Sequence, residues 1–225
     1  MLDRIFQLLA PHSCYSCGKT GQTLCDNCKY DITQEPFFGC IVCCGATAPD
    51  GVCRGCKTEY ERAWAVAERT AAIEQLIDGY KFSHQKASSR VLVELLDEVL
   101  PDFSPYSPTV VPIPTIAQHI RMRGYDHVAL VAKAFAARRQ IRYAPLLSRQ
   151  TTTKQIGASR RQRFENAKHA FGCHATISED APILLIDDIF TTGATLTYAA
   201  KALKEAGAST VWAAVLARQP LDHKE

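Results

Sequence analysis

The chain has 225 residues, of which 47% are hydrophobic and 22% are charged, so it can bury one ordinary globular core with a small appendage and is not a disordered chain. No apolar run approaches the ~18 residues of a membrane helix, and residues 1–10 are too short and too acidic for a signal peptide. We therefore expect a cytoplasmic protein that does not insert into a membrane.

The net charge of +3 is distributed unevenly along the chain. Residues 115–170 contain twelve lysines and arginines against two acidic residues, whereas residues 1–60 contain five against six, residues 61–114 five against eight, and residues 171–225 four against seven. This basic quarter of the chain indicates contact with an anionic ligand. A solvated basic face is the alternative.

Nine of the ten cysteines lie between Cys14 and Cys56, as four Cys-x-x-Cys pairs and one additional cysteine, Cys44. Each pair can form a turn that points two thiolates the same way, and two such turns complete a tetrahedral zinc site. Disulfides would need an oxidising compartment. We therefore expect residues 1–60 to form a double zinc-ribbon domain, in which zinc supplies most of the folding free energy.

The pairing of these cysteines leaves alternatives open. Sequential pairing gives one zinc site of Cys14, Cys17, Cys25 and Cys28 and a second site of Cys40, Cys43, Cys53 and Cys56. A cross-braced arrangement, in which the first turn pairs with the third, fits the same spacing. In the second site Cys44 can also replace Cys43, because Cys44 is the residue that precedes the glycine.

The next part of the chain alternates apolar strands with helical patterns. A strand is expected at 64–68, helices at 72–82 and 91–100, and a strand at 109–114. Lys81, near the end of the first helix, either faces a ligand or extends along apolar surface.

A further helix is expected after Arg123 and Gly124, because Val128, Val131 and Phe135 fall on one helical face. A guanidinium near the start of that helix can hold a pyrophosphate through paired hydrogen bonds.

Residues 149–166 are polar, basic and poor in apolar side chains, and they follow a weaker strand candidate at 144–147. A stretch of this length without periodicity is typical of a loop. A lid that closes over a charged reaction has this composition, and so does a plain solvent-exposed loop. The length of the stretch favours the lid.

Residues 183–195 are the most informative stretch. They predict a buried strand, followed by Asp187 and Asp188, a short loop with Gly193, and a helix over 194–206. The N-terminus of a helix attracts a phosphate, whereas two carboxylates suit a ribose diol or a magnesium ion on a polyphosphate. A sugar with a phosphate at one end and a pyrophosphate at the other satisfies both requirements.

Another buried strand is expected at 210–216. Strands that alternate with helices predict an α/β fold with a mostly parallel sheet flanked by helices. Ligands bind such sheets at the carboxyl ends of the strands, which is where the acidic pair and the following loop are expected to lie.

Residues 186–195, Ile-Asp-Asp-Ile-Phe-Thr-Thr-Gly-Ala-Thr, resemble the phosphoribosyl-pyrophosphate (PRPP) loop of the type I phosphoribosyltransferases. The whole chain resembles the ComF family, which includes GntX-like proteins. That resemblance rests on this loop together with the cysteine pairs, Val-Pro-Ile-Pro at 111–114, Arg123-Gly124-Tyr125, and the spacing of Gln155, Arg163 and Asn166. It implies a zinc-ribbon domain joined to a type I phosphoribosyltransferase domain over residues 61–225, in a family linked to DNA uptake in natural competence.

The resemblance also implies roles for individual residues. Asp187 and Asp188 would hold the ribose hydroxyls and, with Arg123, would form the catalytic set. The 5-phosphate would lie against Thr191, Thr192, Gly193, Ala194 and Thr195, the pyrophosphate beside Arg123 and Gly124, and Gln155, Arg163 and Asn166 would belong to a flexible loop. After Tyr125 the chain has Asp126-His127 where the family has Asn-Gln, so the resemblance assigns this pair no role.

Two functions fit these features. An enzyme would transfer the phosphoribosyl group of PRPP, with Mg²⁺ on the leaving pyrophosphate, to an acceptor that the sequence does not identify. A binding module of the DNA-uptake machinery would instead follow single-stranded DNA with its basic stretch, act beside other competence proteins, and use PRPP only as a regulator. We favour the enzyme.

Overall fold

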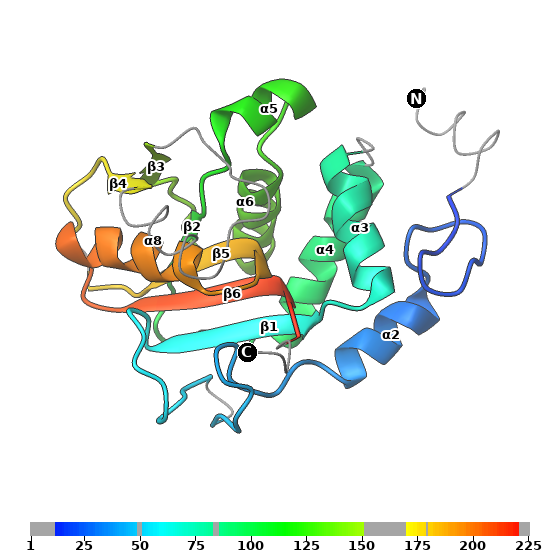
Figure 1. Ribbon diagram of the computed structural model, residues 1–225, viewed down its shortest axis with the longest axis horizontal. Helices are drawn as coiled ribbons and strands as arrows, with labels where there is room; N and C mark the ends of the chain where they lie inside the picture. Colours follow the sequence, from blue (N-terminus) through cyan, green and yellow to red (C-terminus); the bar gives the residue numbers. More distant parts are fainter. Residues whose placement is uncertain (1–11, 49–50, 83–85, 151–169, 179, 221–225) are drawn as a thin grey trace.

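A parallel sheet forms the centre of the computed structural model, which describes residues 12–48, 51–82, 86–150, 170–178 and 180–220 (Figure 1). Its strands are arranged in the order β1-β6-β5-β2, and each neighbouring pair is parallel. They are β1 (Arg62–Glu68), β2 (Thr109–Pro112), β5 (Ile183–Phe190) and β6 (Val211–Arg218). The predicted α/β fold with a mostly parallel sheet is confirmed.

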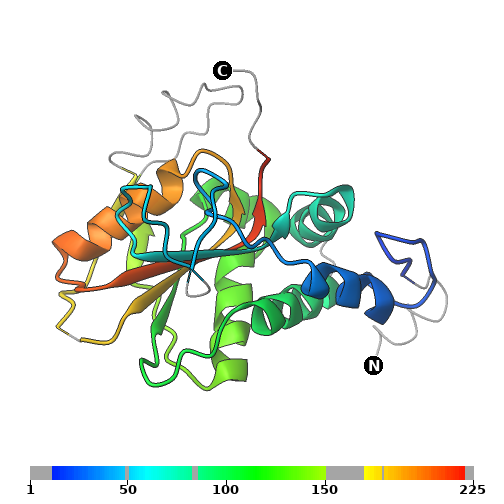
Figure 2. The ribbon, with the colours of Figure 1, turned by 90° about the horizontal axis from the view of Figure 1, so that it is seen from below.

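Helices cover both faces of this sheet (Figures 1 and 2). On one face lie α3 (Ala71–Phe82), α4 (Lys86–Val99) and α6 (His127–Arg139), and on the other lies α8 (Ala194–Glu205). This arrangement explains why the strands are apolar on both sides: all eight residues of β6 are buried.

Strand β5 divides its side chains between the two cores. Leu184 and Ile186 pack with α3, α4 and α6, whereas Ile183 and Leu185 pack with α8. All four side chains are at most 2% exposed, and burial of a side chain of this size contributes about 1.5–3 kcal/mol. The strand is therefore held firmly up to the acidic pair that follows.

The two cysteine-rich segments contact opposite faces of the sheet. The first segment continues into α2 (Asp26–Gln34), which packs against α4 and places Lys29 Nζ 3.1 Å from Glu94 Oε2. Leu24 belongs to the core of α3 and α4, whereas Ile41 of the second segment belongs to the core of α8. Each segment therefore shares a core with the sheet domain.

Some elements differ from the sequence-based expectation. Helices α2 and α5 (Ala117–Arg123) were not predicted; α2 buries only Cys28 and α5 buries no residue, so neither has an apolar periodicity. Strand β3 (Leu147–Arg149) begins three residues later than expected at 144, and it pairs antiparallel with an unpredicted strand, β4 (Phe171–Cys173). Arg149 therefore belongs to a strand, while residues 151–169 of the expected loop lie outside the described residues.

No helix within the described ranges is both long enough and apolar enough to cross a membrane.

Candidate functional site

The loop after β5 has the geometry that the sequence predicts for a strand–loop–helix anion site. Strand β5 ends at Phe190, and α8 begins at Ala194. Gly193 caps α8 with a φ of +81°, in the left-handed region that favours glycine. A Cβ atom at this position would lie 2.9 Å from the Phe190 ring, so any side chain here would be strained and would force the ring to shift. The first turn of α8 therefore presents its backbone N–H groups at the end of β5.

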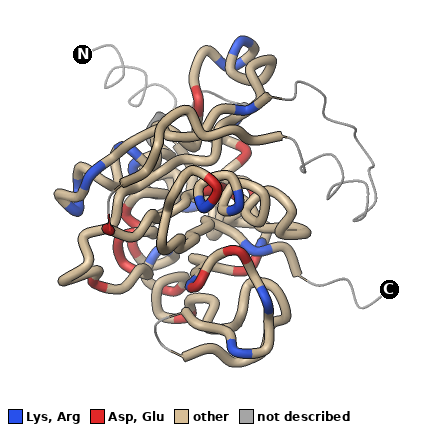
Figure 3. Tube along the Cα trace, turned by 90° about the vertical axis from the view of Figure 1, so that its left-hand side faces the viewer, with Lys and Arg blue, Asp and Glu red and all other residues tan. Residues whose placement is uncertain are grey.

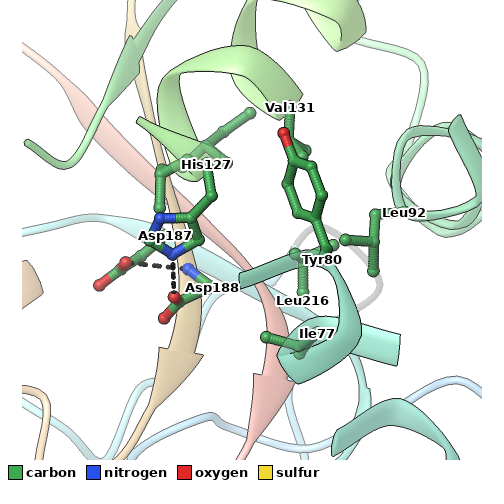
Figure 4. Close-up of a pocket in the computed structure, with 10 residues that line it drawn as sticks. Ile77, Tyr80, Leu92, His127, Val131, Asp187, Asp188 and Leu216 are labelled. Carbon is green, nitrogen blue, oxygen red and sulfur yellow. Dashed lines mark hydrogen bonds and ion pairs between the residues drawn. The ribbon is translucent and has the colours of Figure 1, made fainter. Parts of the chain in front are cut away.

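The acidic pair lies within β5 rather than after it, because the strand continues to Phe190. The Asp188 carboxylate oxygen Oδ2 lies 2.6 Å from Lys81 Nζ and 2.6 Å from His127 Nε2. Asp187 Oδ1 accepts a hydrogen bond of 2.8 Å from the backbone N–H of Asp188. Figure 4 shows the two carboxylates beside the His127 ring.

The two neighbouring carboxylates have opposite electrostatic environments. Burial raises the pKa of Asp187, and the negative charge of Asp188 raises it further. Burial also acts to raise the pKa of Asp188, but the charge of Lys81 and the hydrogen bond from His127 outweigh it and hold that pKa below its ordinary value. The charge of Asp188 is thus already balanced by Lys81 and His127, whereas Asp187 is the more basic of the two carboxylates.

Arg123 lies shortly before the start of α6, as expected, and it also ends an unpredicted short helix. It is the last residue of α5, and Gly124 caps that helix with a φ of +80°. Arg123 Nη1 lies 3.0 Å from His127 Nδ1. Arg123, the residue predicted to bind pyrophosphate, is therefore connected to Asp188 on β5 by the imidazole of His127.

Asp126 fixes the segment that connects Arg123 to α6. Its carboxylate caps α6 by accepting hydrogen bonds of 3.1 Å from the N–H groups of Val128 and Ala129. The same carboxylate accepts a bond of 2.9 Å from the Thr115 hydroxyl and one of 3.2 Å from the Thr115 N–H. The loop after β2 and the start of α6 are thereby held together.

These groups line a single cleft of about 220 Å³. Of the residues predicted from the sequence, Arg123, Asp187, Asp188 and Thr195 line it, and Thr191, Thr192, Gly193 and Ala194 form the turn that leads to Thr195. Gly124 lies beside Arg123 and does not itself line the cleft. Gln155, Arg163 and Asn166 lie outside the described residues.

The cleft also contains residues that the sequence did not assign to it. The sequence predicted that Lys81 either faces a ligand or extends along apolar surface. In the structure Lys81 lines the cleft and pairs with Asp188. Thr115, His119, His127 and Arg149 were not assigned. The prolines around Thr115 indicated an irregular loop after a strand, but no motif in the sequence shows which of these four residues would converge.

Arg149, the last residue of β3, is a half-buried cation that lines the cleft. Its guanidinium donates a hydrogen bond of 3.4 Å to the Pro114 carbonyl and lies 5.2 Å from the centre of the Phe171 ring. Burial lowers the pKa of Arg149, and the charge of Asp187 opposes that effect. The residue therefore combines a positive charge with a position beside the acidic pair.

Part of the basic quarter of the chain has a structural role. Arg138 and Arg139 at the end of α6 both pair with Asp97 of α4. Figure 3 shows lysines and arginines of the described chain spread over several elements and interspersed with acidic residues. Arg160, Arg161 and Arg163 lie outside the described residues. The positive charges that the structure brings to the cleft are those of Lys81, Arg123 and Arg149.

The cysteines form two groups of four whose sulfur atoms lie within 4.8 Å of one another. They are Cys14, Cys17, Cys25 and Cys28, and Cys40, Cys43, Cys53 and Cys56, the sets given by sequential pairing. Tetrahedral zinc with Zn–S bonds of about 2.3 Å separates its sulfur ligands by about 3.8 Å. The observed Sγ–Sγ distances of 3.7 Å for Cys17–Cys25 and 3.9 Å for Cys43–Cys53 fit this geometry.

The first turn of each group repeats the same backbone pattern, which distinguishes Cys43 from Cys44. Gly18 donates its N–H to the Cys14 carbonyl, and Cys44 donates its N–H to the Cys40 carbonyl. Gly18 has a φ of +76° and Cys44 a φ of +60°. Cys44 therefore occupies the position of Gly18 in the repeated turn and points away from the group, whereas Cys43 corresponds to Cys17.

The comparison with known proteins agrees with this site. Residues 109–225, just over half of the chain, match the family described as the phosphoribosyl transferase domain. The chain is 25% identical over 219 residues to competence protein ComFC of Streptococcus pneumoniae, covering 88% of this chain and 96% of that protein. It is 26% identical over 210 residues to competence protein F of Haemophilus influenzae, covering 87% and 90% of the two chains.

A third relative is the DNA utilization protein YhgH of Escherichia coli, which is 25% identical over 206 residues, with 88% of this chain and 85% of that protein covered. The matched family domain begins at β2 and includes Arg123, the acidic pair and the loop before α8. The chain therefore belongs to the phosphoribosyl transferase domain family, and its similarity to competence proteins ComFC and F and its two cysteine groups agree with the predicted resemblance to the ComF family.

Proposed function

We propose that the protein binds PRPP with Mg²⁺ in the cleft at the end of β5 and transfers the phosphoribosyl group to a nucleophile. The observation that carries this proposal is that one cleft, to which the loop before α8 leads, combines the acidic pair, Thr195 and the cations Lys81 and Arg123. PRPP has a ribose diol between a 5-phosphate and a pyrophosphate. Its chemical groups therefore match the donors and carboxylates that meet at the cleft.

Each part of the ligand has a partner in this proposal. Asp187 and Asp188 accept hydrogen bonds from the ribose hydroxyls, and the backbone of Thr191–Thr195 binds the 5-phosphate at the start of α8. Arg123, with Gly124 beside it, binds the pyrophosphate at the opposite end of the cleft. The catalytic set is then Asp187, Asp188 and Arg123.

The reaction is a displacement at C1 of the ribose. The bond from C1 to the pyrophosphate oxygen breaks, and its electron pair leaves with pyrophosphate, while a lone pair of the nucleophile forms the new bond to C1. The carboxylates of the acidic pair face the ribose, whose ring becomes positive, and Arg123 faces the leaving group, which becomes negative. Bound Mg²⁺ would neutralise further charge on the pyrophosphate.

Lys81 and His127 both contact the same oxygen of Asp188, Oδ2. The Lys81 ammonium group and the Asp188 carboxylate are only 13% and 17% exposed, so their ion pair is shielded from solvent. We propose that the anionic ligand attracts Lys81 and releases a carboxylate oxygen for the ribose hydroxyl. The same lysine then adds a positive charge to the pyrophosphate end.

We further propose that each cysteine group binds one structural zinc ion. The division into a metal-binding domain of residues 1–60 and a phosphoribosyltransferase domain of residues 61–225 belongs to this proposal. Backbone N–H groups of Cys25 and Val42 lie 3.4 Å from the sulfur atoms of Cys14 and Cys40, which suits anionic thiolates. Elemental analysis of purified protein should give two zinc ions per chain, and Cys43→Ser should reduce this to one while Cys44→Ser keeps two.

The names of the relatives support a cellular role in the uptake of DNA during natural competence, because competence protein ComFC and competence protein F cover most of this chain. Free thiols in both cysteine groups fit a reducing compartment such as the cytoplasm. Competence proteins are the partners that this role predicts.

Single-stranded DNA is the other ligand to test, because the sequence of residues 149–166 is basic. If DNA is the main ligand, binding should weaken steeply with salt, and neutralisation of Arg160, Arg161 and Arg163 should abolish it. A lack of DNA binding at low salt would exclude this function and leave the transferase.

The experiment that tests the transferase incubates the protein with PRPP, Mg²⁺ and a panel of bases, amines and oligonucleotides, and measures the release of pyrophosphate. We expect release with at least one acceptor from wild type and none from Asp187→Ala/Asp188→Ala. PRPP binding without release from any acceptor would instead support a sensor that uses PRPP as a regulator.

A further inference from the structure

His127 lines the cleft and uses both nitrogen atoms of its ring. The residue is 6% exposed and is the first residue of α6. Its Nε2 lies 2.6 Å from the Asp188 carboxylate, and its Nδ1 lies 3.0 Å from Arg123 Nη1. The ring therefore connects the residue proposed for the pyrophosphate with a residue proposed for the ribose.

The chemistry of the two partners determines where the proton of this imidazole lies. A guanidinium has only N–H donors, so the nitrogen that faces Arg123 must accept a hydrogen bond. Nδ1 is therefore unprotonated, and the ring proton is on Nε2, from which it is donated to Asp188. The more distant Thr115 hydroxyl, 3.4 Å from Nδ1, uses its own proton in the shorter bond of 2.9 Å to Asp126.

The backbone around His127 holds the ring in this orientation. Asp126 caps α6 and binds Thr115, which places the first residue of the helix at a fixed position. The Tyr80 ring lies 6.4 Å from the imidazole in an edge arrangement, and Tyr125 donates a hydrogen bond to the Tyr80 carbonyl. Because Tyr80 precedes Lys81, the same contacts also place the lysine that pairs with Asp188.

We propose that His127 is a positioning residue that transmits a directed chain of hydrogen bonds from Arg123 through the imidazole to Asp188. This chain orients the cation at the pyrophosphate end and the carboxylate at the ribose end with respect to each other. The effect of His127 on PRPP binding rests on the proposed function. The chain of hydrogen bonds itself is a property of the free protein. It also gives a role to a residue that stands where the ComF pattern has glutamine.

The chemistry of glutamine supplies a conservative variant for the test. A glutamine amide has an oxygen that can accept from Arg123 and an NH₂ group that can donate to Asp188, so His127→Gln retains both bonds. A leucine fills the buried space but can neither accept nor donate. A comparison of the two variants therefore separates hydrogen bonding from packing.

The first measurement is the tautomer of His127 in the full-length wild-type protein labelled with ¹⁵N-histidine. His127→Gln identifies the His127 signal by its loss, and His174→Leu, at a histidine outside the cleft lining, serves as the control. We expect a neutral ring with its proton on Nε2 at pH 7.5. A proton on Nδ1, or on both nitrogens, would overturn the proposed chain whether or not PRPP binds.

The second measurement is calorimetric binding of PRPP with Mg²⁺ to wild type, His127→Gln and His127→Leu, with melting temperature and zinc content as checks of folding. Loss of two hydrogen bonds to charged groups should weaken binding by about tenfold or more in His127→Leu, whereas His127→Gln should stay within about threefold of wild type. Equal affinity of His127→Leu and wild type would overturn the positioning role. If His127→Leu fails to fold, His127→Asn, whose shorter side chain cannot reach both partners, replaces it with the same expectation.

The failure of the proposed function has a different signature in these data. A wild-type protein that does not bind PRPP would reject the PRPP site, while the tautomer measurement would still decide whether the Arg123–His127–Asp188 chain exists. A wild type that binds PRPP with a proton on Nδ1 would keep the site and reject the chain.

Discussion

The loop before α8 and the ion pairs around Asp188 both lie toward the end of β5, but they prepare their polar groups in different ways. In the loop, the chain conformation itself aims the backbone at a ligand, because Gly193 turns β5 directly into α8. Around Asp188, by contrast, the side chains of Lys81 and His127 already bind the carboxylate that the ligand needs.

This difference indicates how binding proceeds. In the proposed site the loop needs no rearrangement to receive a phosphate, so it would bind the 5-phosphate first. In the proposed exchange Asp188 replaces Lys81 by a ribose hydroxyl, so the contribution of the acidic pair depends on where Lys81 moves. Substitutions in the loop should therefore act through backbone conformation, and substitutions around Asp188 should act through charge.

The largest expected single effect is that of Gly193→Ala. An alanine at a φ of +81° is strained, and its Cβ would approach the Phe190 ring to 2.9 Å. The turn should shift, with a loss of about 30-fold or more in PRPP affinity from about 2 kcal/mol of conformational cost. Calorimetry checks the affinity.

The matched control for Gly193→Ala is Gly18→Ala, which has a similar φ of +76° but no atom within 4 Å of the added Cβ. It should lower stability slightly and leave the PRPP affinity unchanged. If both variants bind PRPP as wild type does, the loop is not preformed for the 5-phosphate.

Lys81→Met should weaken PRPP binding by about tenfold, because the cleft loses one of its cations. The control is Lys29→Met, which breaks another partly buried lysine–carboxylate pair, with Glu94, outside the cleft. Titration of both variants with PRPP measures the effect. Tighter binding by Lys81→Met would contradict the proposed exchange and would show that Lys81 only competes with the ribose for Asp188.

Asp187→Asn should stabilise the free protein while it weakens PRPP binding by less than Gly193→Ala does. Because burial and Asp188 raise the pKa of Asp187 above 3.8, the charged form costs stability, and that cost grows as the pH rises from about 4 through the raised pKa. At pH 8 the asparagine variant should therefore be more stable by about 1 kcal/mol, or about 2–4 °C in melting temperature.

Asp188→Asn should have the opposite sign. Its pKa is lowered in the folded protein, so its charge stabilises the fold above a pH of about 4, and this contribution is lost only in acid. The variant should melt below wild type at pH 7. If both asparagine variants lowered the melting temperature equally, the two carboxylates would not differ in environment as described.

The smallest expected effect is that of a substitution at Cys44. It measures the cost of a side chain at positive φ at a position that binds no ligand. Cys44 has a φ of +60° at the position that Gly18 occupies in the first cysteine group. Cys44→Gly should raise stability by about 0.5–1 kcal/mol and leave the zinc content unchanged. Chemical denaturation measures the change, and a loss of zinc would show that Cys44 is a ligand.

The sequence predicted the loop half of the site more completely than the charged half for a physical reason. The strand, the acidic pair and Gly193 are contiguous, and each residue type has a local meaning. Lys81, His127 and Arg149 come from α3, α6 and β3, and only the packing of these elements on the sheet brings them together. Neither the bond from His127 to Asp188 nor the difference between the two carboxylates can be seen in the sequence.

The fold shows the same limit. Apolar runs of β5 and β6 predicted the parallel sheet, because strands buried on both faces have an unmistakable pattern. Helix α5 buries no side chain, so no periodicity marked it, and the sequence predicted only the helix that follows Arg123 and not the one that ends there. In the cysteine groups, Gly45 after Cys44 suggested that Cys44 could be the ligand, whereas the repeated turn assigns Cys43.

The most direct test of the central claim is calorimetric titration of PRPP and Mg²⁺ into wild type and Asp187→Ala/Asp188→Ala. The control is Asp31→Ala/Glu35→Ala, which removes two exposed carboxylates far along the chain from the cleft. We predict saturable binding of one PRPP per chain by wild type and by the control, and no measurable binding by the variant without the acidic pair. Equal binding by all three proteins would contradict the assignment of the β5 cleft as the PRPP site.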